Sequence, residues 1–185
     1  MTAQIVVVLA PGFEEIEAVT PIDVLRRAEL DVTIAGVGAT AICGSHGISY
    51  GCDTTIEKID GVPDAIVLPG GLPGSDNLAR SNAVRDLVLA VREKGGVCAA
   101  ICAAPAVAFA SFGLLEGKRA TCYPGLEHLF GESTTHSEER VVVDGQLVTS
   151  RGPGTALEFS LQLVAMLASE SCAAELREGM LVASS

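Results

Sequence analysis

The sequence predicts an α/β protein in which helices cover both faces of a mostly parallel sheet. Short apolar runs alternate with longer amphipathic segments along the chain, and this alternation is typical of parallel sheets. Hydrophobic residues make up 49% of the 185 residues, which suits buried strands covered by helices. The length is about that of one domain, and the composition does not change along the chain. We therefore expect a single domain over residues 1–185.

Five apolar runs are expected to form the strands, because they are short and rich in residues that favour extended backbone. They are Ile5–Ala10, Val32–Ala35, Ala65–Leu68, Val97–Ile101 and Gln146–Thr149. Within residues 140–149, two β-rich runs flank Asp144-Gly145, and an Asp-Gly pair in this setting predicts a small β-hairpin.

Four amphipathic segments are expected to form helices. They are Glu14–Arg27, Val84–Glu93, Ala104–Phe112 and Ala156–Ala168. Thr155 precedes the last helix and Glu158 follows three residues later, so the pattern predicts a capping box. The end of the chain, Ala183–Ser185, is expected to fray.

The formal charge of −11 makes nucleic acid and anionic membranes unexpected partners, because like charges repel. No apolar run reaches the ~18 residues of a membrane span. The first residues also lack the basic start of a signal peptide. We therefore expect a cytoplasmic protein, or an organellar one if a transit peptide has been removed.

The cysteines and histidines do not show the spacing of a metal site. No C-x-x-C pair occurs, and the three histidines stand apart in the sequence, whereas a zinc site needs clustered ligands. A chain of this size and apolar content does not depend on disulfides. Free thiols and no bound metal are expected.

Cys102 lies where the predicted strand Val97–Ile101 ends and the next helix begins, with Pro105 in the first helical turn. Ligands of open parallel sheets bind beyond the carboxyl ends of the strands. A sharp turn there would project the thiol outward, and the helix N-terminus would lower its pKa. The alternative is a buried structural cysteine, as we expect for Cys98.

Glu17 lies with Glu14 and Glu15 in the first turns of the predicted helix that follows the first strand. Acidic residues commonly stabilise a helix start, and this role is one interpretation. Glu17 also roughly continues the apolar stripe of the helix, so an inward-pointing carboxyl is the alternative. Burial would raise its pKa and let the protonated carboxyl donate a hydrogen bond to a thiolate.

Gly70 and Gly71 directly follow another predicted strand and Pro69. Their backbone N–H groups are candidates to stabilise a developing oxyanion, and a simple tight turn is the alternative. Phosphate-loop motifs are absent. His128 and His136 have no fixed relation to Cys102, and we interpret both as ordinary surface residues.

Four segments in order carry a resemblance to a known family. They are VLAPGFEEIE at residues 8–17, VLPGG at 67–71, AAICAAP at 99–105 and TSRGPGT at 149–155. From Ile5 to about Val182 the sequence resembles the ThiJ/PfpI superfamily, and most closely its parkinsonism-protein (DJ/YajL-like) branch. The resemblance implies a flavodoxin-like sandwich and a homodimer.

The resemblance also implies the roles of the residues singled out above. Cys102 would be the nucleophile at an elbow, and Glu17 would be its hydrogen-bond partner. The region of Gly70, Gly71 and Ala103 would supply the oxyanion pocket.

This sequence departs from the family pattern at two places. Tyr123 stands where some members carry a histidine near the cysteine, so proton transfer falls to Glu17 or water, and Tyr123 is expected to shape the pocket together with Pro153. His46 stands where close relatives often carry an arginine across the dimer, and it is a candidate contribution from the partner subunit. Ala103 replaces the histidine that follows the cysteine in distant proteases, so proteolysis is not expected.

The branch is associated with a glutathione-independent glyoxalase activity that converts methylglyoxal or glyoxal to the hydroxy acid, D-lactate from methylglyoxal, with no cofactor. Protein deglycation is also ascribed to it, so glycated protein is a second substrate class beside small α-oxoaldehydes. The implied alternative is an oxidative-stress sensor or redox-regulated chaperone in which Cys102 is oxidised to sulfinate. For the enzyme, we expect Cys102 to form a hemithioacetal and Glu17 to move protons through an enediol.

Overall fold

A computed structural model describes residues 2–183. Its centre is a seven-stranded sheet with strand order β10-β11-β7-β6-β1-β2-β5, in which only β10 runs antiparallel to its neighbour. The strands are β1 Gln4–Leu9, β2 Asp31–Gly36, β5 Thr54–Thr55, β6 Ala65–Leu68, β7 Val97–Ile101, β10 Val141–Asp144 and β11 Leu147–Ser150. The mostly parallel sheet predicted from the sequence is confirmed, as is the hairpin at Asp144-Gly145.

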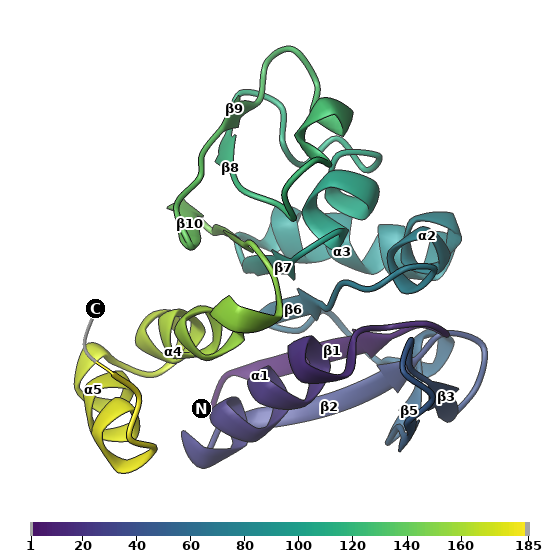
Figure 1. Cartoon of the computed structure of the whole chain (residues 1–185). Coiled ribbons are helices and arrows are strands. Elements are labelled where there is room, and N and C mark those ends of the chain that lie inside the picture. The colour runs from purple at the N-terminus through teal and green to yellow at the C-terminus, as the bar shows by residue number, and fades with distance from the viewer. Residues whose placement is uncertain (1, 184–185) are drawn as a thin grey trace.

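Helices cover both faces of this sheet, which gives the α/β sandwich of Figure 1. The α-helices are α1 Glu15–Arg27, α2 Gly74–Arg80, α3 Asn82–Lys94, α4 Ala156–Leu167 and α5 Glu170–Gly179. α1 packs against α4, and α5 packs on α4 from outside. None of the helices in residues 2–183 is long and apolar enough to cross a membrane.

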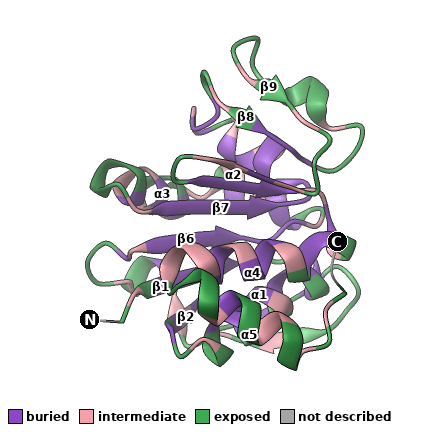
Figure 2. Ribbon diagram, turned by 90° about the vertical axis from the view of Figure 1, so that its left-hand side faces the viewer, coloured by how far each residue is buried: buried purple, intermediate pink, exposed green. Residues whose placement is uncertain are grey.

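Two hydrophobic cores lie on opposite faces of the sheet, because neighbouring strand residues point to opposite sides. In β1, Val7 packs into the core shared with α1 and α4, whereas Val8 packs into the core shared with α2 and α3. Figure 2 shows β6 and β7 buried along their length. This double burial explains why the strands read as apolar runs without alternation.

Two local predictions differ from the structure. The expected helix at 104–112 contains a π-helical segment, η2 Pro105–Phe109, in which the N–H of Ala110 donates to the carbonyl of Pro105 over 3.0 Å. The expected capping box is also wrong. Thr155 instead bonds the backbone of Gly152, and Glu158 pairs with Arg140.

Several short elements were not predicted. A second hairpin joins β3 Ala41–Cys43 to β4 Ser49–Gly51, and a small parallel pair joins β8 Arg119–Ala120 to β9 Thr135–His136, away from the main sheet in Figure 1. Short 3₁₀ turns occur at η1 Ile56–Lys58, η3 Glu127–Leu129 and η4 Pro153–Thr155. The expected fraying concerns Ser184 and Ser185, which lie outside the described residues.

Candidate active site

Cys102 forms a sharp turn at the carboxyl end of β7. Its φ of +64° lies in the left-handed region, which a non-glycine residue rarely adopts and which clusters at functional sites. Two backbone bonds hold this turn: the N–H of Cys102 donates to Ser150 over 2.9 Å, and the N–H of Tyr123 donates to the Cys102 carbonyl over 2.7 Å. The backbone therefore has the elbow form expected from the sequence.

Glu17 projects inward from the first turns of α1 and is 0% exposed. Its Oε2 accepts a hydrogen bond of 2.9 Å from the N–H of Gly70. Its Oε1 is buried and accepts no hydrogen bond from residues 2–183. Glu14, not Glu17, caps the helix, because Glu14 Oε2 accepts from the Glu17 N–H over 2.8 Å.

Gly70 lies between the thiol and the carboxyl and fixes their closeness. A Cβ placed on Gly70 would come within 2.6 Å of both Cys102 Cβ and Glu17 Oε2, so only a hydrogen atom fits there. The backbone N–H groups of Gly71 and Ala103 favour the thiolate of Cys102, because they act to lower the pKa of its thiol. The structure thus brings together the predicted nucleophile, carboxyl and oxyanion region.

Burial controls the proton affinity of both groups. Burial raises the pKa of Glu17 to about 7, although hydrogen bonding from Cys102 and the Gly70 N–H opposes the rise. Burial, and then the negative charge of Glu17, also raise the pKa of Cys102 above its ordinary value, and the N–H groups of Gly71 and Ala103 offset only part of this. The lowered pKa expected for Cys102 is therefore not found. A thiolate is expected here only when Glu17 holds a proton.

Tyr123, Gly152 and Pro153 close the site on the side of the free Glu17 oxygen. A Cβ on Gly152 would lie 3.4 Å from the Tyr123 ring and 3.9 Å from Glu17 Oε1. Tyr123, Gly152 and Pro153 line a cavity of about 360 Å³, whereas Glu17 does not. Gly152 was not predicted as a site residue, although the Gly-Pro-Gly run after a strand was a signal for it.

His46 does not contact Cys102 or Glu17 within the described chain. Its Nδ1 lies 2.8 Å from Glu15 Oε2, and its side chain is largely exposed. Burial opposes ionisation of Glu15, but the hydrogen bonds from His46 outweigh it and lower the pKa of Glu15 to about 2. In residues 2–183 the only three metal-ligating side chains within 4.8 Å of one another are Glu14, Glu15 and His46, and their hydrogen bonds to one another and to the α1 backbone occupy them.

The other histidines and cysteines lie apart from the site. His128 bonds the carbonyl of Gly125, and His136 lies beside Phe130. Cys98 is buried, and burial raises the pKa of its thiol to about 12. This agrees with a structural role for Cys98.

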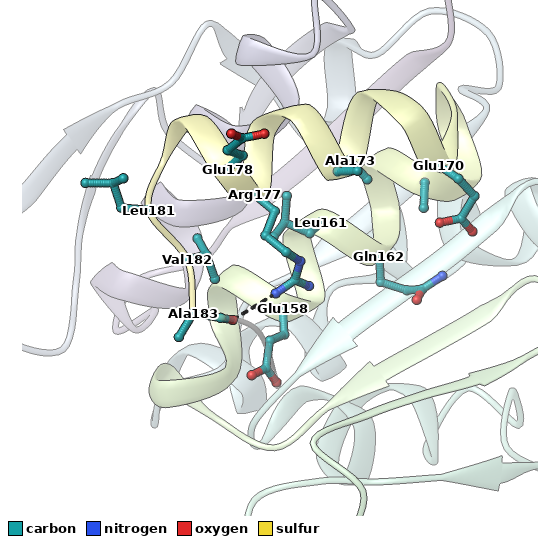
Figure 3. A pocket seen from close by; sticks show the side chains of 12 residues that line it. Glu158, Leu161, Gln162, Glu170, Ala173, Arg177, Glu178, Leu181, Val182 and Ala183 are labelled. Carbon is teal, nitrogen blue, oxygen red and sulfur yellow. Dashed lines mark hydrogen bonds between the residues drawn. The ribbon is translucent and has the colours of Figure 1, made fainter.

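A larger hollow lies elsewhere in the described part of the chain. It measures about 600 Å³ and lies between α4, α5 and residues 181–183, with Leu161 and Val182 on its walls and Arg177 bonded to the carbonyl of Ala183 (Figure 3). Neither Cys102 nor Glu17 lines it. Cavity size alone therefore does not locate the chemistry of this protein.

Known proteins resemble this chain in sequence and in overall structure. The sequence profile of the DJ-1/PfpI family matches residues 3–166. The chain belongs to the DJ-1/PfpI family. The protein dj-1beta of Drosophila melanogaster is 41% identical over 186 residues, which cover 99% of each chain. Its crystal structure matches this DJ-1/PfpI member with a TM-score of 0.95 over 100% of both chains, at 41% identity.

Other relatives are longer than this chain, have a named activity or have a structure described as oxidized. Protein DJ-1 homolog B of Arabidopsis thaliana is 46% identical over 94% of this chain, but the match spans only 40% of the plant protein. The glutathione-independent glyoxalase DJR-1.2 of Caenorhabditis elegans is 33% identical over 83% of this chain and 82% of its own. A structure of Toxoplasma gondii DJ-1, described as oxidized, is 35% identical with a TM-score of 0.95 over 99% of this chain and 100% of its own.

Proposed function

We propose that this chain is a cofactor-independent glyoxalase that converts methylglyoxal or glyoxal to the hydroxy acid. The observation that carries the proposal is the placement of two groups on either side of Gly70: Cys102 on a left-handed elbow and Glu17, a fully buried carboxyl with one free oxygen. A relative named as a glutathione-independent glyoxalase supports this activity within the family.

The first step joins sulfur to the aldehyde carbon. Glu17 accepts the thiol proton as Cys102 attacks and passes it to the former aldehyde oxygen, so that a neutral hemithioacetal forms and Glu17 is ionised again. The N–H groups of Gly71 and Ala103, which lower the pKa of the thiol, would also stabilise the oxygen that gains negative charge. The high pKa of the Cys102 thiol makes this transfer to Glu17 necessary.

The second step moves a proton along the carbon chain. Glu17 removes the hydrogen of the former aldehyde carbon and returns a proton to the neighbouring carbon through an enediol, which leaves a thioester on Cys102. Water hydrolyses the thioester, so that one water is consumed and the hydroxy acid and free thiol are released.

Loss of the thiol tests this proposal. Cys102→Ser is expected to abolish lactate formation from methylglyoxal, because a hydroxyl is a far weaker nucleophile than a thiolate. Thermal unfolding of the same preparation checks that the variant is folded. A folded Cys102→Ser protein with full activity would show that the mechanism is wrong.

Deglycation is a second activity that we propose for the same site, with the carbonyl adduct of a protein side chain as substrate. Its separate existence requires two assays on one preparation, one with free methylglyoxal and one with a preformed adduct freed of aldehyde. Product from the second assay supports deglycation. Product only while free aldehyde is present assigns the apparent deglycation to glyoxalase turnover.

A redox sensor or redox-regulated chaperone is the second candidate function, favoured by the Toxoplasma gondii relative described as oxidized. Protonated Glu17 would then donate a hydrogen bond to a Cys102 sulfinate. Mass spectrometry after mild peroxide treatment would show a selective gain of about 32 Da, two oxygen atoms, at Cys102. Such oxidation with negligible turnover favours the sensor, whereas fast turnover without it favours the enzyme.

We also propose that the protein forms a homodimer through an apolar face on the α1 side. Ile16, Val19, Ile48 and Leu157 are large apolar residues that are exposed there. Val19 and Leu157 line one hollow, and the N–H of Ile48 bonds Glu15 at the start of α1. His46, in the adjoining loop, would then reach the partner subunit.

A further inference from the structure

The cavity beside Glu17 is larger than a three-carbon aldehyde requires. It measures about 360 Å³ and is bounded by Tyr123, Gly152 and Pro153 at the end nearest the reaction centre. Gly152 connects the cavity with Glu17. It lines the cavity, and a Cβ placed on it would lie 3.9 Å from Glu17 Oε1. A substrate whose carbonyl reaches Cys102 would therefore extend its remaining atoms into this cavity.

The cavity contains one arginine without an acidic partner. Arg151 donates from Nη1 to the backbone carbonyl of Glu138 over 3.0 Å and forms no ion pair within residues 2–183. Arg140 lines the same cavity but is already satisfied, since it lies 2.7 Å from Glu158 Oε2 and 2.7 Å from the Gly154 carbonyl. A guanidinium has five N–H donors, so Arg151 keeps most of its hydrogen-bonding capacity.

The remaining charged group of the cavity is the Glu138 carboxylate. It lines the wall with Arg151, yet it is not ion-paired with any residue of the described chain. Arg151 is tied to the Glu138 backbone, which holds the guanidinium in place without neutralising it. In a protein of net charge −11, this unpaired cation at the cavity wall favours the approach of an anionic ligand.

We propose that Arg151 recognises a carboxylate on the substrate, so that the preferred substrates are α-oxoaldehydes with an anionic group a few carbons from the dicarbonyl. This inference rests on the proposed glyoxalase function and names its substrate class. The planar guanidinium fork matches a carboxylate in two parallel hydrogen bonds. The reaction at Cys102 and Glu17 is unchanged, and only the tail of the substrate meets Arg151.

Two probe aldehydes of equal chain length test the proposal. In 4,5-dioxopentanoate the chain ends in a carboxylate, and in 2-oxopentanal it ends in a methyl group. The readout is the ratio of kcat/KM for the acid to kcat/KM for the neutral aldehyde. Wild type is expected to prefer the acid, and Arg151→Gln is expected to lower the ratio roughly tenfold, the effect of one charge-assisted hydrogen bond.

Two further variants act on the same ratio in known directions. Arg151→Lys is expected to recover part of it, because the charge remains but the fork is lost. Glu138→Gln is expected to raise it, because a nearby negative charge is removed. These two variants carry the test should Arg151→Gln fail to fold, as judged by thermal unfolding.

Arg92→Gln is the matched control. Arg92 likewise donates from Nη1 to one backbone carbonyl, that of Gly113 over 3.2 Å, but it lines a different hollow. Its ratio should equal that of wild type. An unchanged ratio in both Arg151→Gln and Glu138→Gln overturns the recognition of the carboxylate while the glyoxalase function stands. A wild-type protein that converts methylglyoxal but neither five-carbon aldehyde overturns the inference alone, and one that converts none of the three overturns the function and the inference together.

Discussion

The Glu17 carboxyl is fully buried, and its ionisation therefore works against folding. Its pKa is about 7 in the folded chain against an ordinary value of 4.5, so the folded state binds more protons between these values. The contribution of the protonated Glu17 carboxyl to stability is then fully present below pH 4.5 and is lost as the pH rises through about 7. The sign follows from burial without a full complement of hydrogen-bond donors.

Glu17→Gln is expected to be more stable than wild type at about pH 8, by up to ~3 kcal/mol from the size of the pKa shift, and to lose this advantage near pH 4.5. Urea unfolding at both pH values measures the difference. Glu15→Gln is the control with opposite sign, since the pKa of Glu15 is lowered to about 2. The loss of stability in Glu15→Gln should be fully present above pH 4.5 and should become smaller as the pH falls below 4.5. A Glu17→Gln protein less stable than wild type at about pH 8 would contradict the claim that the buried charge of Glu17 destabilises the fold.

Gly70→Ala tests the closeness of the two reacting groups. The added methyl would meet Cys102 Cβ and Glu17 Oε2 at 2.6 Å, so the side chains must separate. We expect a loss of stability of about 1–3 kcal/mol, as for other overpacked sites, and a large loss of activity. Gly131→Ala is the control, because a Cβ there meets no atom within 4 Å. Equal activity of the two variants would show that Gly70 does not set the geometry.

Among single residues, Cys102 and Glu17 could be proposed from the sequence as site residues, but the backbone conformation of Cys102 and the burial of Glu17 could not be predicted. Their place after strands could be predicted, because parallel strands end at one edge of a sheet. The left-handed φ of Cys102 and the full burial of Glu17 arise only when β7, β6 and α1 pack together. Arg151 could not be singled out from sequence, because whether an arginine is paired depends on which acid the fold brings near it.

At the scale of elements, the long segments followed the sequence closely. α1 and α3 lie within a few residues of their predicted bounds because their apolar faces repeat at the helical period. α2 was missed because its N-cap Pro73 offers no side-chain cap, and the two-residue strands β8 and β9 are too short to show a pattern. The π-helical segment η2 was not predicted, because π-helices are rare and a helical pattern in the sequence indicates an α-helix.

α5 was also missed, and its start depends on one side chain. Ser169 Oγ accepts a hydrogen bond of 3.1 Å from the N–H of Cys172. Ser169→Ala is expected to destabilise α5 by about 1 kcal/mol, the usual effect of losing an N-cap, whereas Ser169→Asp keeps the cap. Hydrogen exchange of the α5 amides measures the difference. Equal protection in the two variants would show that the cap is not needed.

At the scale of the whole molecule, the apolar face on the α1 side is the feature that the proposed dimer would cover. Val19→Asp places a charge in that face without touching the Cys102 site. It is expected to shift the sedimentation of the protein from dimer to monomer, since a buried unpaired charge is costly. Asp86→Asn, at an exposed position of α3, should leave the dimer intact. A monomeric wild type would contradict the proposal.

The central claim is that Cys102 and Glu17 act as one catalytic pair, and a double-mutant cycle on methylglyoxal turnover tests it most directly. Residues that act as a unit have non-additive effects on rate. We expect Cys102→Ser, Glu17→Gln and the double variant to lose kcat to a similar residual level, each by a factor of at least roughly 10². Independent losses that multiply in the double variant, or full activity of Glu17→Gln, would contradict the claim.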